Sequence, residues 1–151
     1  MPTGMEWVMW IPREANKAAD YLAGRAIQTQ MDCMHIGKGT RNRQADLAVW
    51  TDAGLEEGRL GCGGLAKNMK TGEVVWAFSV RLESTGRGAE EDINCGELAA
   101  ASFGVGMLLA TRVGSLDEWM ESCSCHRMPA PEVEKLCRLA WAMRTSLRSR
   151  M

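Results

Sequence analysis

The stretch Leu47-Ala48-Val49-Trp50-Thr51-Asp52-Ala53-Gly54 predicts a buried strand that ends on a carboxylate. Residue types that favour strands run up to Thr51, and Ala53-Gly54 is expected to open a turn directly after Asp52. A carboxylate held at the end of a rigid strand is well placed to bind a metal ion. A carboxylate that only begins a turn has no such role, and this stretch by itself leaves both interpretations open.

Two further strands follow and predict an antiparallel meander. Residues 60–66 and 73–82 have strand character, and short turns at 55–59 and 67–72 connect them. The second strand contains several glycines, which lack side chains and are typical of a strand that another backbone approaches closely.

A buried helix is predicted after the meander. Residues 98–110 are apolar almost all round, and Asn94 to Glu97 leads into them from a polar, acidic loop at 84–92. Glu97 is expected in the first turn of this helix, where the positive end of the helix dipole favours an acid.

The C-terminal part predicts a basic helix and leaves one segment open. Residues 111–117 form either a short strand that ends on Asp117, or the start of a helix that Ser115 caps before Leu116. The last helix is expected over 132–148. Its arginines point either to a solvated face or to contact with a nucleic-acid backbone: Arg138, Arg144, Arg148 and Arg150.

The N-terminal part predicts a strand at 7–11 and a helix from Glu14 onward. Alanines recur at three-and-four spacing in this helix, which permits close approach to a sheet. Asn16 and Asp20 are four residues apart and therefore share one helix face. Residues 28–45 are expected to be a polar, flexible connector.

Composition fits one compact domain that is expected to lie inside the cell. The length of 151 residues suits a single domain, and a net charge of -1 provides no overall basic field for binding nucleic acid. Neither a signal-peptide pattern nor an apolar run of membrane-spanning length is apparent, so no membrane association is expected.

Six cysteines are expected to be free thiols in a reducing compartment. A zinc site is the alternative for some of them, although their spacings differ from those of zinc fingers. The residues in question are Cys33-x-His35 and Cys123-x-Cys125-His126.

Two parts of the chain resemble one family. The Thr51-Asp52-Ala53-Gly54 motif, the strands after it and the helix entered by Asn94-x-x-Glu97 resemble the first half of a type 1 ribonuclease H domain. The PREANxxADxLA pattern at 12–23, with the strand before it, resembles the last strand and final helix of retroelement and plant-type members. The resemblance implies an α/β fold with a mixed sheet, an antiparallel meander extended by parallel strands, flanked by helices.

The order of these parts implies a circularly permuted single domain over 1–151. Residues 1–27 correspond to the family's C-terminal strand and helix, 28–45 connect the old ends, and 46–151 correspond to its N-terminal and middle part. Exposed, neighbouring termini make permutation tolerable. A slice across two tandem copies has the same order, and a polyprotein fragment completed by strand exchange is a third alternative.

The resemblance also implies an acidic metal-binding cluster. Asp117 is the nearest candidate for its fourth carboxylate, and Leu116 is the alternative occupant of that position. The family's loop histidine corresponds to Trp10. The catalytic and metal-binding residues carried over are Asp52, Glu97, Asp20 and Asp117, and the nucleic-acid contacts are Asn94 and Asn16.

The implied activity is metal-dependent hydrolysis of the RNA strand of RNA–DNA hybrids. Mg²⁺, or Mn²⁺ in its place, suits carboxylate and water oxygens, and two such ions activate water and stabilise the leaving 3′ oxygen. Other domains of a retroelement polyprotein are expected partners. The alternative is a module that has lost catalysis and only binds nucleic acid or a protein partner.

Overall fold

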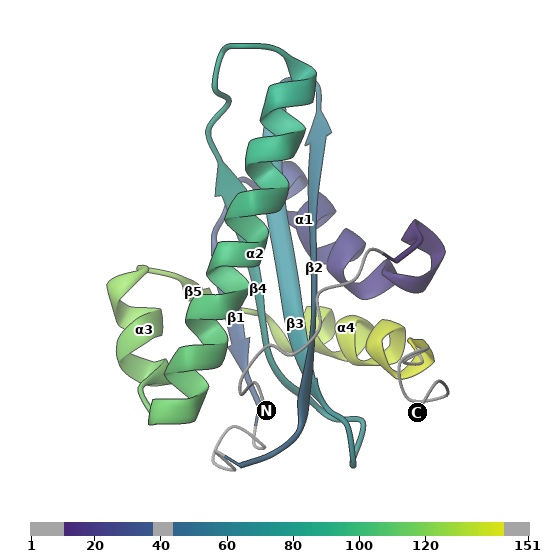
Figure 1. Cartoon of the computed structure of the whole chain (residues 1–151), viewed down its shortest axis with the longest axis vertical. Helices are drawn as coiled ribbons and strands as arrows, with labels where there is room; N and C mark the ends of the chain where they lie inside the picture. Colours follow the sequence, from purple (N-terminus) through teal and green to yellow (C-terminus); the bar gives the residue numbers. More distant parts are fainter. Residues whose placement is uncertain (1–10, 38–43, 144–151) are drawn as a thin grey trace, which may run out of the picture.

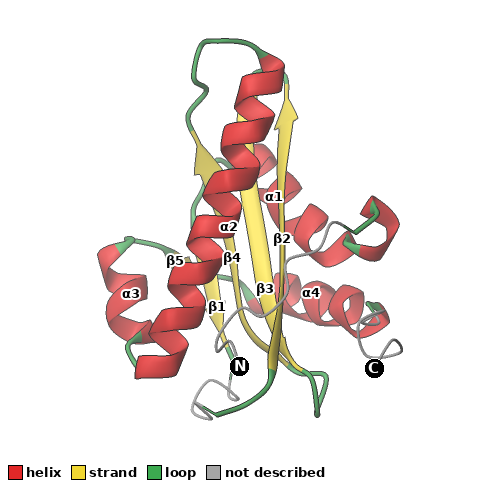
Figure 2. Cartoon of the chain, in the orientation of Figure 1, coloured by secondary structure: helices red, strands yellow, loops and turns green. Residues whose placement is uncertain are grey.

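The computed structural model describes residues 11–37 and 44–143, which form three layers (Figure 1). A five-stranded sheet lies between α1 and α4 on one face and α2 and α3 on the other (Figure 2). The expected α/β class with a mixed sheet is confirmed. The elements are η1 (Arg13–Ala15), α1 (Lys17–Thr29), β1 (Cys33–Ile36), β2 (Leu47–Glu56), β3 (Arg59–Asn68), β4 (Val74–Leu82), α2 (Ala89–Val113), α3 (Leu116–Ser122), β5 (His126–Arg127) and α4 (Ala130–Ala142).

The sheet has the order β2-β3-β4-β1-β5, in which only the β1–β5 pair is parallel. The predicted meander is confirmed as β2-β3-β4. The prediction that its first strand ends at Asp52 is wrong, because β2 continues to Glu56 and Asp52 pairs with Gly63 in mid-ladder. The chain turns instead at Glu57 and Gly58, whose φ angles of 52° and 77° suit a two-residue hairpin turn.

The prediction of a polar connector over 28–45 is wrong for its middle part. Helix α1 extends to Thr29, and residues 33–36 form β1, which pairs antiparallel with β4 and parallel with β5. Cys33 and Met34 are fully buried, so burial of these side chains offsets the cost of ordering the segment. Residues 38–43 of the expected connector and 7–10 of the expected first strand lie outside the described residues.

Helix α2 begins earlier than predicted. It starts at Ala89, within the stretch expected to be a loop, so Glu97 lies in its third turn. Asp92 stabilises this early start, because it accepts hydrogen bonds from the Ser84 hydroxyl and from the Thr85 amide and hydroxyl, each 2.7 Å long.

The segment after α2 forms a helix, as one of the two alternatives predicted. Helix α3 begins at Leu116 with Ser115 in the N-cap position, although the Ser115 side chain makes no capping hydrogen bond. A strand ending on Asp117 is therefore wrong. Helix α4 ends at Ala142, and 144–151, with three of the four arginines expected in the last helix, lie outside the described residues.

Glycines of β3 allow the alanine-rich face of α1 to lie directly on the sheet, as predicted. A Cβ atom at Gly63 would lie 2.4 Å from the Leu22 Cβ and 2.7 Å from the Ala23 backbone nitrogen. On the same face, the buried Lys67 ammonium donates hydrogen bonds to the carbonyl oxygens of Ala140 (2.6 Å) and Met143 (2.9 Å). A cation at the C-terminal end of α4 is favoured by the helix dipole.

Helix α2 has the length and hydropathy of a membrane span, which corrects the expectation that no apolar run does. Core helices of soluble proteins share these features, and 33% of the relevant window is buried in this fold. The helix therefore gives no basis for assigning a membrane span. Its outward face carries exposed apolar side chains: Leu98, Leu109 and Val113.

Candidate functional site

The N-terminus of α1 is attached to the outer side of β2 by one side chain. The Asn16 amide nitrogen donates a hydrogen bond to the Thr51 carbonyl oxygen at 3.0 Å, and only 8% of Asn16 is exposed. Among the described strands β2 lies at the edge of the sheet, so Asn16 occupies a backbone acceptor that pairs with no described strand. This contact places the first turn of α1 beside the residue that follows Thr51.

That residue is Asp52, and it meets Asp20 of α1. Side chains alternate between the faces of β2, and Gly63, the cross-strand partner of Asp52, faces α1. Asp20 lies one turn after Asn16 on the same helix face. Asp20 lies close enough to Asp52 to raise the pKa of its carboxyl group, both through its charge and as a hydrogen-bond partner.

Burial and, to a smaller extent, the neighbouring Asp20 raise the pKa of Asp52 to about 6. The Ala53 backbone amide, which hydrogen-bonds to the carboxyl group, and the nearby Arg13 guanidinium act in the opposite direction. Burial and a like charge both favour the neutral acid over the carboxylate. Above about pH 6 Asp52 is therefore a carboxylate at a half-buried position beside Asp20.

The oxygens at this site are of the kind that Mg²⁺ prefers. Asp20 and Asp52 contribute carboxylates, and the buried Asn16 Oδ1 has no hydrogen-bond partner among the described residues. A cation or a water would satisfy that oxygen. No group of three or more His, Cys, Asp or Glu side chains arranged to hold a metal occurs within residues 11–37 and 44–143. A cation here would thus rest on two carboxylates, with waters completing its shell.

The structure does not bring Glu97 to the Asp20–Asp52 pair. Helix α2 covers the opposite face of the sheet, where a Cβ at Gly96 would lie 3.0 Å from the Ala53 Cβ. Glu97 follows Gly96 and is exposed on α2. The sheet therefore separates Glu97 from the pair.

Asp117 does not join the pair either. It is exposed on α3, which packs with α2 on the far side of the sheet from α1 (Figure 1). The catalytic and metal-binding roles of Asp117 and Glu97 stay predictions.

The two asparagines expected to contact nucleic acid differ in exposure. Asn94 is exposed on α2, whereas Asn16 is buried and already holds the Thr51 carbonyl. Asn16 positions Asp20 in the described fold, and contact with nucleic acid stays a prediction for both. Arg138 of α4 is exposed and pairs with Glu134 at 3.4 Å, while Trp10 lies outside the described residues.

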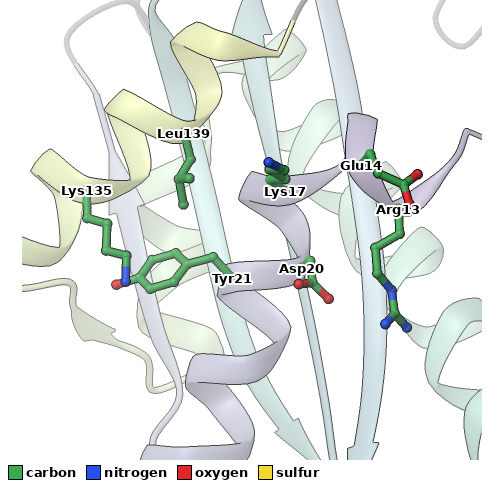
Figure 3. Close-up of a pocket in the computed structure, with 7 residues that line it drawn as sticks. All are labelled: Arg13, Glu14, Lys17, Asp20, Tyr21, Lys135 and Leu139. Carbon is green, nitrogen blue, oxygen red and sulfur yellow. The ribbon is translucent and has the colours of Figure 1, made fainter.

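A groove beside the acidic pair was not predicted from the sequence. It runs between α1 and α4 and has a volume of about 480 Å³ (Figure 3). Two of its residues, Tyr21 and Lys135, belong to different helices, and the Lys135 Nζ lies 4.7 Å from the centre of the Tyr21 ring. The only local signal was the four-residue spacing of Lys17 and Tyr21 on α1. The lining residues are Arg13, Glu14, Lys17, Asp20, Tyr21, Lys135 and Leu139.

The cysteines are all free thiols in the described structure, as expected. The β1–β5 pairing places Cys33 opposite His126, so two of the segments considered for zinc do meet. Burial raises the pKa of Cys125 to about 12, with a smaller contribution from nearby Cys123, which disfavours the thiolate that a metal would need.

The chain was compared with protein-family models, with curated proteins and with solved structures, and no match was found in any of the three.

Proposed function

We propose that this protein is a metal-dependent endonuclease of the ribonuclease H type, which hydrolyses the RNA strand of RNA–DNA hybrids. The observation that carries the proposal is the meeting of Asp20 and Asp52. These residues come from the two separate stretches that resemble the ribonuclease H family, and Asp20 lies close enough to Asp52 to raise its pKa. Circularly permuted order and association with other domains of a retroelement polyprotein belong to the same proposal.

Asp20 and Asp52 would hold Mg²⁺ or Mn²⁺. The buried Asn16 Oδ1, which has no partner among the described residues, belongs to the helix turn before Asp20. A bound divalent cation supplies an activated water and neutralises charge that develops on the phosphate. Asp52 must release its proton to act as a ligand, so binding should strengthen as pH rises past about 6. The rigid β2 ladder and the Asn16–Thr51 hydrogen bond keep the two carboxylates in place.

The test is cleavage of a hybrid whose RNA strand carries a fluorescent label. We expect cleavage in Mg²⁺, none in EDTA, and none of duplex DNA. Asp52→Asn and Asp20→Asn should each abolish cleavage. Glu56→Gln is the matched control, because Glu56 lies on the same strand and is exposed. Equal cleavage by native protein and Asp52→Asn would show that the pair is not the catalytic site.

A binding module without catalysis is the second candidate. The observation that favours it is the separation of Glu97 and Asp117 from the pair by the sheet, which leaves two carboxylates where the resemblance implies three or four. In this case the native protein binds the hybrid with measurable affinity, and neither Mg²⁺ nor Mn²⁺ supports cleavage. Calorimetric titration with Mn²⁺ separates the candidates further, since the nuclease requires metal binding that Asp52→Asn weakens.

A further inference from the structure

We propose that the groove between α1 and α4 binds one nucleotide of a single-stranded RNA segment next to the acidic pair. Its phosphate would lie against Arg13 and Lys17, and its sugar and base against Tyr21 and Leu139. This inference rests on the proposed function, because it assumes that the RNA strand bound at Asp20 and Asp52 continues into the groove. Its own support comes from the size, charge and walls of the groove.

The size of the groove suits a nucleotide. The groove is open to solvent, and its volume of about 480 Å³ leaves room for one nucleotide. Asp20 lines the groove and also lies beside Asp52, so the groove and the acidic pair are continuous. A strand that places one phosphate at the pair would therefore place the neighbouring nucleotide in the groove.

The charges of the groove favour a phosphate. Arg13, Lys17 and Lys135 are exposed cations, and none of them forms an ion pair with another described residue. The two acids of the groove, Glu14 and Asp20, oppose this attraction. A divalent cation on the acidic pair would offset the Asp20 charge, so the groove should bind phosphate more tightly when Mg²⁺ is present.

The other end of the groove combines the Tyr21 ring, beside which the Lys135 ammonium lies, with the apolar side chain of Leu139. Figure 3 shows Tyr21 reaching from α1 towards Lys135 on α4, whereas Asp20 and Arg13 lie at the opposite end. Tyr21 and Leu139 are half-buried, so each presents part of its surface to the groove. A nucleobase stacks on an aromatic ring whatever its sequence, while lysine and arginine neutralise the backbone phosphate. An aromatic end beside a cationic end matches the two parts of a nucleotide.

The walls of the groove are held together beneath it. Arg25 of α1 forms a largely buried ion pair with Glu132 of α4. Leu22 of α1 belongs to the same buried cluster as Leu136 and Ala140 of α4. The two helices are thus fixed relative to each other before any ligand binds, which lowers the entropic cost of binding.

The test is fluorescence anisotropy with a labelled single-stranded RNA tetranucleotide, measured on the full chain in EDTA and in Mg²⁺. We expect Lys17→Gln to weaken binding about fivefold because it removes a phosphate contact, and Tyr21→Leu about fivefold or more because it removes the stacking surface. Lys135→Gln should also weaken binding about fivefold, because it removes the cation that lies beside the Tyr21 ring. Arg138→Gln is the matched control on α4, since Arg138 is exposed but lies outside the groove, and it should change the Kd less than twofold. Lys135→Arg should bind as the native protein does.

The outcome is separable from that of the proposed function. The anisotropy assay runs in EDTA and with Asp52→Asn as well, so it does not depend on catalysis. RNA binding that depends on Lys17, Lys135 and Tyr21 therefore supports a nucleotide site in the groove even when no hybrid is cleaved. Absence of tetranucleotide binding by folded native protein would overturn the inference. The groove inference would also be overturned if the Lys17, Lys135 and Tyr21 variants had the same Kd for the tetranucleotide and the same KM for the hybrid as Arg138→Gln. This holds whatever the rate of cleavage. Circular dichroism confirms that each variant is folded.

Discussion

Replacing Asp52 by asparagine should stabilise the protein in the absence of metal, and only above about pH 5. The substitution keeps the shape of the side chain and removes its charge. Burial and the neighbouring Asp20 raise the pKa of Asp52 from 3.8 to about 6. That difference corresponds to ~3 kcal/mol at most, and screening by solvent at this half-buried position reduces the expected gain to about 1–2 kcal/mol.

The sign of the effect follows from proton binding. Because the folded-state pKa is raised, the native protein holds this proton more tightly than the unfolded chain between about pH 4 and 6. The free energy of unfolding of the native sequence therefore falls as pH rises through this window. Below pH 3.8 both states are protonated and the difference between Asp and Asn should vanish, whereas above pH 6 it should be complete.

Urea unfolding at pH 4 and pH 7.5 in EDTA measures the gain, with Glu56→Gln as the exposed control on the same strand. In a chain of 151 residues the gain at pH 7.5 corresponds to a rise in Tm of about 2–8 °C. Saturating Mn²⁺ should reverse the order, because only the native site binds it strongly. Equal gains at both pH values, or an Asp52→Asn protein that is less stable at pH 7.5, would refute the placement of a half-buried Asp52 beside Asp20.

Four further predictions concern packing, a buried lysine and the separated acids. Gly63→Ala should destabilise the fold by about 2–3 kcal/mol in urea unfolding, because its Cβ would lie 2.4 Å from a neighbouring Cβ. Gly24→Ala in the adjacent helix meets no atom within 4 Å and should stabilise by about 0.5–1 kcal/mol; a loss there would contradict the packing described. Lys67→Met should cost about 1–3 kcal/mol in the same assay, because two carbonyl oxygens at the end of α4 lose their donor. Glu97→Gln and Asp117→Asn should leave the calorimetric Kd for Mn²⁺ unchanged, and a tenfold loss in either would place that acid at the site after all.

Local sequence patterns were sufficient to predict the meander, the alanine-rich helix and the helical conformation of residues 98–110. Each of these depends on periodicity and turn residues within one short stretch, so hydrophobic burial on one face is visible without knowing its partner. The prediction that the helix over 98–110 is buried almost all round is wrong, because its outward face is exposed. The close approach of α1 to β3 was also predictable, because alanines on the helix and glycines such as Gly63 on the strand have little or no side chain to keep the two backbones apart. The boundaries of these elements were misplaced in places, as at Asp52, where the turn depends on Glu57 and Gly58 adopting positive φ.

Tertiary structure alone decided which side chains meet. Residues 33–36 are too few to stand out among polar neighbours, and they become a strand because β4 and β5 offer edges on either side. Asn16 and Asp20 were known to share a helix face, but the hydrogen bond to Thr51 is what brings Asp20 to Asp52. Glu97 is separated from them because α2 packs on the opposite face of the sheet. The choice of face and the order of strands depend on contacts between distant parts of the chain, which no local pattern encodes.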